Sequence, residues 1–139
     1  ILSGLVGSEM CIRDSLRTGH ADEAAELVTK VRERNFTEHP AKAIVTGEQL
    51  QETSCYDYGR RDNVKSTHDH AIIQYGRMLD ELGWEFSQEG RRRQDMVRFG
   101  VFSTRSWFSH DASSKEKNLY PIPNSQILTN PNLKQNPGY

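Results

Sequence analysis

The first half of the chain carries apolar residues at helical spacing. One stripe recurs every three or four positions and consists of Ala24, Leu27, Val28 and Val31. That period places all of its members on one face, so it predicts an amphipathic helix from about Ala21 to Asn35. Acidic residues open this segment and basic residues close it, which suits the dipole of a helix.

A second stripe predicts a longer helix in the middle of the chain, from about His70 to Gln88. Its members are Ile72, Tyr75, Leu79, Leu82 and Phe86. Gly90 is a suitable stop for it, because glycine readily adopts the left-handed cap conformation. A third, short helix is predicted from Arg91 to Phe99, and Gly100 ends it in the same way.

The remaining segments are less periodic. Pro40 and Gly47 interrupt residues 36–67, although Thr46 begins a string that fits the cap of a short helix. From Val101 onward, prolines exclude a long helix or a central strand, and they are Pro121, Pro123, Pro131 and Pro137. One helical turn is expected near residues 125–129. The expected apolar anchors of this tail are Leu119, Tyr120, Ile122, Ile127 and Leu128. The pattern therefore predicts an all-α chain with an extended, proline-rich C-terminal tail.

The composition is polar for 139 residues, with 35% hydrophobic and 27% charged residues and a mean hydropathy of -0.78. Small domains bury a limited share of their surface, so this polarity fits a solvated helical protein or a piece of a larger one. The net charge of -1 gives no general attraction to nucleic acid or anionic lipid. The two cysteines, Cys11 and Cys55, are too few to predict a disulfide framework or a zinc site.

The N-terminal segment stands apart from the rest. Residues 6–15 read Val-Gly-Ser-Glu-Met-Cys-Ile-Arg-Asp-Ser, a string that resembles a translated sequencing adapter. The segment shows no convincing helical or strand period and no legible secretory signal. We therefore expect residues 1–15 to be a non-native leader without a part in the fold, and residues 16–139 to carry the fold.

Four strings follow one another in the second half. They are Leu82-Gly83-Trp84-Glu85-Phe86, Glu89-Gly90-Arg91-Arg92, Asp95-Met96-Val97-Arg98-Phe99-Gly100, and Leu119-Tyr120-Pro121-Ile122-Pro123 with the ending from Asn130 to Tyr139. In this order and spacing they resemble the closing region of the RagB/SusD family of nutrient-binding lipoproteins. Val31-Arg32-Glu33-Arg34 is similar to the family's repeat helix, which ends in Val-Arg-x-Arg. The residues that we assign to this structural motif are Trp84, Glu89, Gly90, Arg92, Asp95, Arg98, Pro121 and Pro123.

The resemblance implies a helical protein built on tetratricopeptide-like helix pairs, which binds oligosaccharides or other nutrients, performs no chemistry and needs no cofactor. It also implies a lipoprotein on the outward face of the cell outer membrane, working with a TonB-dependent (SusC-like) transporter. Family members are several times longer than this chain, so residues 16–139 would be the C-terminal part of a SusD-like domain. The lipid-anchor cysteine would then lie upstream, since Cys55 is in mid-chain.

The charged residues that could carry out chemistry are better explained by structural roles. Three glutamates recur at intervals of four, namely Glu81, Glu85 and Glu89. Neighbouring carboxylates can form an acid/base pair, but ion pairing explains these better. Glu89 stands four residues before Arg93, which is the favourable orientation for a helix ion pair. A buried Glu89 held by Arg91 or Arg92 would also fix the following turn.

Two further patterns have simple explanations. Four arginines surround Asp95, namely Arg91, Arg92, Arg93 and Arg98. A phosphate-binding patch is one interpretation, but pairing of Asp95 with Arg91 and Arg98 is simpler. His68-Asp69-His70 lacks the spaced partner ligands that a zinc site needs. We therefore expect no catalytic residue and no metal ligand.

Exposed aromatic rings are the usual platforms for sugars, and four residues could act in this way: Trp107, Phe108, Tyr56 and Tyr58. Core packing is the default for such side chains. The hypothesis is thus a cell-surface glycan-binding protein with an oligosaccharide ligand and a transporter partner. The alternative is a small soluble helical module whose tail binds a protein.

Overall fold

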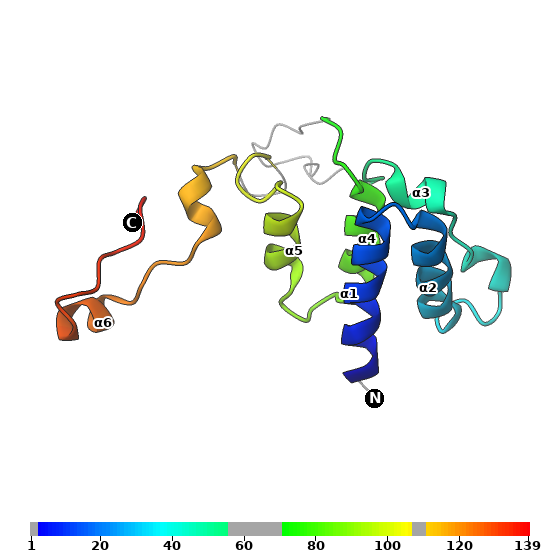
Figure 1. Ribbon diagram of the computed structural model, residues 1–139, viewed down its shortest axis with the longest axis horizontal. Coiled ribbons are helices and arrows are strands. Elements are labelled where there is room, and N and C mark those ends of the chain that lie inside the picture. The colour runs from blue at the N-terminus through cyan, green and yellow to red at the C-terminus, as the bar shows by residue number, and fades with distance from the viewer. Residues whose placement is uncertain (1–2, 56–70, 107–110) are drawn as a thin grey trace, which may run out of the picture. The chain divides into compact units, whose positions relative to one another are not determined.

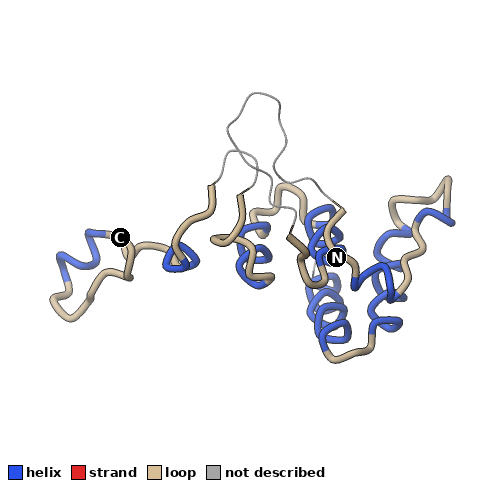
Figure 2. Tube along the Cα trace, turned by 90° about the horizontal axis from the view of Figure 1, so that it is seen from above, coloured by secondary structure: helices blue, strands red, loops and turns tan. Residues whose placement is uncertain are grey.

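The computed structural model describes residues 3–55, 71–106 and 111–139. The contacts between segments divide the chain into two units. Of the described residues, the first unit holds those up to 55 together with 71–92, and the second holds the rest. Every regular element in these ranges is a helix (Figure 1, Figure 2), which confirms the predicted all-α fold class.

The first unit begins with a helical hairpin, in which α1 (Ser3–Arg17) and α2 (Ala21–Glu33) are joined by a short turn. α1 packs against α2 and buries Ile12 and Leu16. The expectation that residues 1–15 lack regular structure is therefore wrong. Ile12 and Leu16 stand four apart, so they share the helix face that meets α2. The assignment of residues 1–15 as a non-native leader stays a prediction.

α2 matches the helix predicted from the first apolar stripe, and its buried residues are Ala24, Ala25 and Val28. A 3-10 turn, η1 (Pro40–Lys42), precedes the short helix α3 (Gly47–Gln51). The predicted cap at Thr46 is confirmed as a capping box. The amide of Gln49 donates to the Thr46 hydroxyl, and the amide of Thr46 donates to the side-chain oxygen of Gln49.

The helix α4 (Gly76–Glu85) is shorter than predicted. It starts late because Tyr75 has a left-handed backbone, with a φ of 56°, and because Gly76 packs on the backbone of Ser54, where a Cβ would clash. Ile72 lies before this start and is 84% exposed, so its predicted place on the apolar face is wrong. The residues that do pack inward are Met78, Leu79, Leu82 and Phe86.

The helix α5 (Arg92–Arg98) leads into the second unit and ends at Gly100, as predicted. Gly100 has a φ of 72°, and its amide donates to the Val97 carbonyl while the amide of Val101 donates to the Met96 carbonyl. This is a Schellman motif, which satisfies carbonyls that the helix end would otherwise leave bare. Met96 and Val101, which share the second of these hydrogen bonds, are both buried.

The tail of the second unit contains a 3-10 turn, η2 (Lys115–Asn118), and the short helix α6 (Asn124–Thr129). α6 confirms the single helical turn predicted near residues 125–129. Three of the expected apolar anchors are exposed, namely Leu119, Tyr120 and Leu128. The expectation that they anchor the tail by burial is therefore wrong. Hydrogen bonds of backbone and side-chain groups, rather than buried apolar side chains, hold the tail together.

Candidate functional site

The four proposed sugar platforms lie outside the described residues. They are Tyr56, Tyr58, Trp107 and Phe108. The string His68-Asp69-His70 lies outside them as well. The site that the structure does describe is in the first unit, where α2 faces α4 through charged side chains.

Arg32 is the centre of this contact. Its Nη1 donates to both carboxylate oxygens of Glu81 on α4, each at 2.9 Å. Its Nε and Nη2 donate to the carbonyls of Ala43 and Lys42, at 3.0 and 2.8 Å. Arg77, one turn before Glu81, adds a second ion pair to the same carboxylate at 2.9 Å. Glu81 is buried, and a buried carboxylate needs such compensation to remain charged.

A second pair lies one turn further along α4, and its arginine is the residue that caps the C-terminal end of α2. Arg34 Nη2 contacts Glu85 Oε1 at 2.5 Å. The two arginines of the Val-Arg-x-Arg string therefore pair with two glutamates that stand four apart on α4. This arrangement supports the structural explanation of Glu81 and Glu85, because each carboxylate is already engaged by a guanidinium.

Trp84 projects from α4 beside these pairs. The guanidinium carbons of Arg77 and Arg32 lie 4.7 and 6.0 Å from the centre of its ring. The Trp84 side chain is 38% exposed, so the ring is packed on one part of its surface and open on another. A cation over an indole face is attracted to the ring electrons, and this attraction fixes the ring's orientation.

A cavity of about 240 Å³ lies next to Trp84 between α1, α2 and α4. Its apolar lining includes Ile12 from α1, Val28 and Val31 from α2, and Met78, Leu82 and Phe86 from α4 and its end. The polar residues among its walls are Arg32, Asn35, Glu81 and Glu85. Sequence reasoning missed this cavity, because its walls come from three helices that are far apart in the chain.

Asp80 holds a loop to the buried side of α4. It is 1% exposed, and it accepts hydrogen bonds from the Ser54 hydroxyl at 2.6 Å and from the Cys55 amide at 2.8 Å. Partial desolvation of the thiol and the nearby Asp80 carboxylate raise the pKa of Cys55, which opposes formation of a reactive thiolate. Asp80 therefore acts as a structural clamp on residues 54–55.

Two motif strings meet at Gly83. Arg92 Nη1 donates to the Leu79 carbonyl at 2.6 Å, and a Cβ at Gly83 would come within 2.7 Å of that same Nη1. Gly83 therefore leaves room for the Arg92 guanidinium, which explains why glycine and arginine occur together here. Glu89 is exposed, so the expected burial of this carboxylate is wrong. Gly90 does have the predicted left-handed backbone, with a φ of 73°.

The arginines around Asp95 are engaged within the chain. Arg98 Nη1 lies 3.3 Å from the buried Asp95 carboxylate, which confirms that predicted pair. Arg91 stacks over the Phe86 ring at 4.4 Å. Arg93 lies between the rings of Phe102 and Tyr120, at 4.6 and 3.8 Å. These contacts favour a structural role for the cluster over phosphate binding.

The end of the chain closes onto the Pro121-Ile122-Pro123 string. Both prolines lack an amide hydrogen, so Ile122 has the single N–H of the string. That N–H donates to Gln135 Oε1 at 2.7 Å, and Gln135 Nε2 donates to the Ile122 carbonyl at 2.9 Å. The Gln135 side chain thus pairs with Ile122 as a neighbouring strand would. We call residues 119–139, closed in this way, the C-terminal loop.

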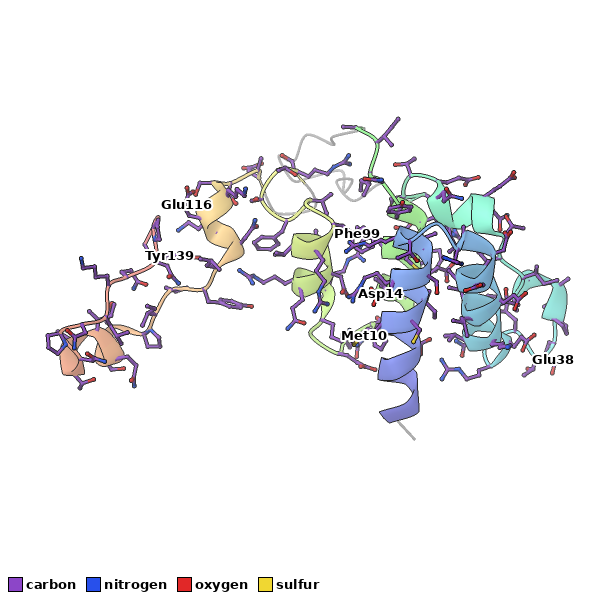
Figure 3. All side chains as sticks on the ribbon, viewed as in Figure 1. Met10, Asp14, Glu38, Phe99, Glu116 and Tyr139 are labelled. Carbon is purple, nitrogen blue, oxygen red and sulfur yellow. The ribbon has the colours of Figure 1, made fainter. Side chains whose placement is uncertain are left out.

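The last residues complete the C-terminal loop. The Tyr139 hydroxyl donates to the Leu119 carbonyl at 2.9 Å. Lys117 Nζ donates to the Gly138 carbonyl at 2.7 Å and lies 3.7 Å from the centre of the Tyr139 ring. In Figure 3, Tyr139 accordingly lies beside the turn that carries Glu116. The first and last parts of the fourth motif string are therefore one structural unit.

The described residues also lack two other kinds of feature, a cluster of metal ligands and a membrane-spanning helix. No group of three or more His, Cys, Asp or Glu side chains is arranged there to hold a metal ion. Within the same ranges, none of the helices combines the length and the apolar character required to span a bilayer.

The geometry is that of a helical scaffold held by arginine contacts, and comparison with known proteins shows what the chain is similar to. The chain is similar to the starch-binding protein SusD of Bacteroides thetaiotaomicron. The two are 41% identical over 87 residues, which cover 57% of this chain and 16% of SusD. No family model and no solved structure matches the chain.

This similarity supports the resemblance that the four motif strings indicate, which is to a SusD/RagB-like fragment. This chain spans 16% of the length of the relative that it matches, so any activity of the whole protein is a proposal. The relative is named for binding and not for catalysis.

Proposed function

We propose that residues 16–139 are the C-terminal part of a non-enzymatic, SusD-like protein that captures oligosaccharides at the cell surface. The observation that carries this proposal is the 41% identity to a starch-binding protein over 87 residues. The order and spacing of the four motif strings support it. Residues 1–15 fall outside the proposal, as a non-native leader.

The first ligand class to test is a starch-like glucan, because the similar protein binds starch. The ion pairs at Glu81 and Glu85 support binding without cleavage, since glycosidases need carboxylates that are free to exchange protons or to attack the sugar. The proposed stacking platforms remain Tyr56, Tyr58, Trp107 and Phe108.

The proposal assigns the complete protein to the outward face of the outer membrane, where a lipid anchor upstream of this chain holds it. Its partner there is a TonB-dependent, SusC-like transporter, which takes over the captured oligosaccharide. These assignments follow from the family resemblance. The proposal includes no cofactor and no nucleic acid.

The test begins with the complete reading frame, expressed as a protein without its anchor cysteine. Isothermal titration with malto-oligosaccharides, alongside a panel of other neutral oligosaccharides, measures binding. Chromatography of the same mixtures detects cleavage. Saturable binding without new sugar products is the expected result. A complete protein that binds none of the panel, or that cleaves a bound sugar, overturns the proposal.

The alternative is a small helical module that binds a protein partner. The observation in its favour is the exposed apolar side chains of the tail, where the partner would bind, at Leu119, Tyr120 and Leu128. The reading frame separates the two functions. A signal peptide with a lipid-attachment cysteine supports the surface protein, whereas a short frame that starts near residue 16 supports the module.

A further inference from the structure

Two tyrosines of the C-terminal loop are more exposed than any other phenylalanine, tyrosine or tryptophan in the described ranges. Tyr120 is 68% exposed and Tyr139 is 47% exposed. The Tyr139 hydroxyl donates to the carbonyl of Leu119, the group that is bonded to the amide nitrogen of Tyr120. The two residues therefore flank one short stretch of backbone, and we call Tyr120 and Tyr139 the tyrosine pair.

A cation covers part of each ring of the tyrosine pair. The guanidinium carbon of Arg93 lies 3.8 Å from the centre of the Tyr120 ring. Arg93 is itself held in place, since its Nη2 donates to the carbonyls of Lys117 and Asn118 at 2.8 and 3.2 Å. The ammonium of Lys117 lies 3.7 Å from the centre of the Tyr139 ring. A cation over an aromatic ring is attracted to the ring electrons, so both exposed rings have a fixed orientation.

A fixed and exposed aromatic ring fits the apolar face of a sugar. A pyranose carries C–H groups on its faces and hydroxyls around its edge, so it can stack on a ring while its hydroxyls keep their hydrogen bonds. A ring that is already fixed loses little conformational entropy when a ligand stacks on it. Polar groups for the hydroxyls lie beside the tyrosine pair, because the Lys117 ammonium contacts Tyr139 and the Glu116 side chain lies next to Gly138.

We propose that the tyrosine pair is a platform on which a neutral gluco-oligosaccharide stacks, in addition to the four platforms proposed from the sequence. This proposal rests on the proposed function, in which the complete protein binds a starch-like glucan. Tyr120 and Tyr139 contact the ligand, and neighbouring sugar units of one chain reach both rings. Arg93 and Lys117 are positioning residues, since they hold the rings from behind.

The first experiment follows the two rings directly in the complete protein, expressed without its anchor cysteine. Its tyrosine rings carry an isotope label for NMR, and Tyr120→Phe and Tyr139→Phe assign the two signals because each variant lacks one tyrosine. Titration with maltoheptaose is expected to shift both signals along a saturable curve. Rings that the rest of the complete protein covers would not shift. Isothermal titration of the same samples measures total binding.

The second experiment compares three variants of the complete protein. Tyr120→Ala is expected to raise the maltoheptaose concentration at the midpoint of the Tyr139 shift about ten-fold, because one stacking surface is lost. Tyr120→Phe keeps the ring and is expected to change that midpoint by less than about two-fold. Leu128→Ala is the control, because it removes another exposed apolar side chain of the C-terminal loop, and it should leave the midpoint unchanged.

An unchanged midpoint in Tyr120→Ala overturns the platform, as does an equal loss in Leu128→Ala. If circular dichroism shows that Tyr120→Ala does not fold, the titration of the unaltered protein decides. Failure of the platform differs from failure of the proposed function. Calorimetric binding of maltoheptaose without a shift of either tyrosine signal overturns the platform alone. A complete protein that binds no oligosaccharide overturns both.

Discussion

We predict that substitutions of the two arginines of the Val-Arg-x-Arg string lower the free energy of unfolding by different amounts. Arg32→Met removes a side chain that is 16% exposed, and with it the contacts to Glu81 and to two backbone carbonyls. Loss of one partner from a buried ion pair costs about 3–5 kcal/mol. Arg77 still neutralises Glu81, so we expect the lower end, about 3 kcal/mol of unfolding free energy. That corresponds to a melting temperature lower by about 10 °C.

Arg34→Met is the control, because it makes the same change two residues away. The Arg34 side chain is 47% exposed and pairs with Glu85, so its loss should cost under about 1 kcal/mol. Urea unfolding followed by circular dichroism measures both values. A double-mutant cycle of Arg32→Met with Glu81→Gln should give a coupling of about 2 kcal/mol. Equal losses for the two arginine variants, or no coupling, would refute the reasoning.

Three further predictions concern other contacts. Asp80→Asn should lower the free energy of unfolding by about 2 kcal/mol in urea titrations, because a buried charged acceptor is lost; an unchanged midpoint contradicts this. In a Cys11→Ser background, Asp80→Asn should increase the rate of alkylation at Cys55 at a fixed pH. The Asp80 carboxylate is one cause of the raised pKa of Cys55, so its replacement leaves more thiolate; a slower rate contradicts this prediction. Gln135→Ala should speed hydrogen exchange of the Ile122 amide about ten-fold by NMR, whereas Gln135→Glu, which keeps the acceptor, should preserve most of the protection.

Local patterns predicted the elements whose causes are local. The stripe on α2, the cap at Thr46 and the glycine stop at Gly100 depend on neighbours within a few positions, and all three are confirmed. The start of α4 depends on Gly76 meeting the backbone of Ser54, which is 22 residues earlier and has no signature in the spacing of apolar residues. The helical period alone therefore extended α4 too far.

The contacts of the candidate site, like the start of α4, depend on residues that are far apart in the sequence. Arg32 belongs to the Val-Arg-x-Arg string and Glu81 to the series of three glutamates, but they stand 49 positions apart, and one sequence contains no sign that they pair. Arg32 and Arg34 stand two apart at the end of α2, whereas Glu81 and Glu85 stand four apart on α4, so spacing alone does not predict which residues pair. The sequence does contain a signal for α1, since Ile12 and Leu16 stand four apart, as residues on one helix face do, and both are buried.

The C-terminal loop is also a suitable site for inserting a foreign segment into the protein. The hydrogen bonds between Gln135 and Ile122 fix both ends of the segment that contains α6. Leu128, within α6, is 86% exposed, and the entropy cost of lengthening a closed loop rises slowly with its length. An epitope or a fluorescent label inserted after Leu128 would therefore report on the protein in cells without opening the bonds that close the loop.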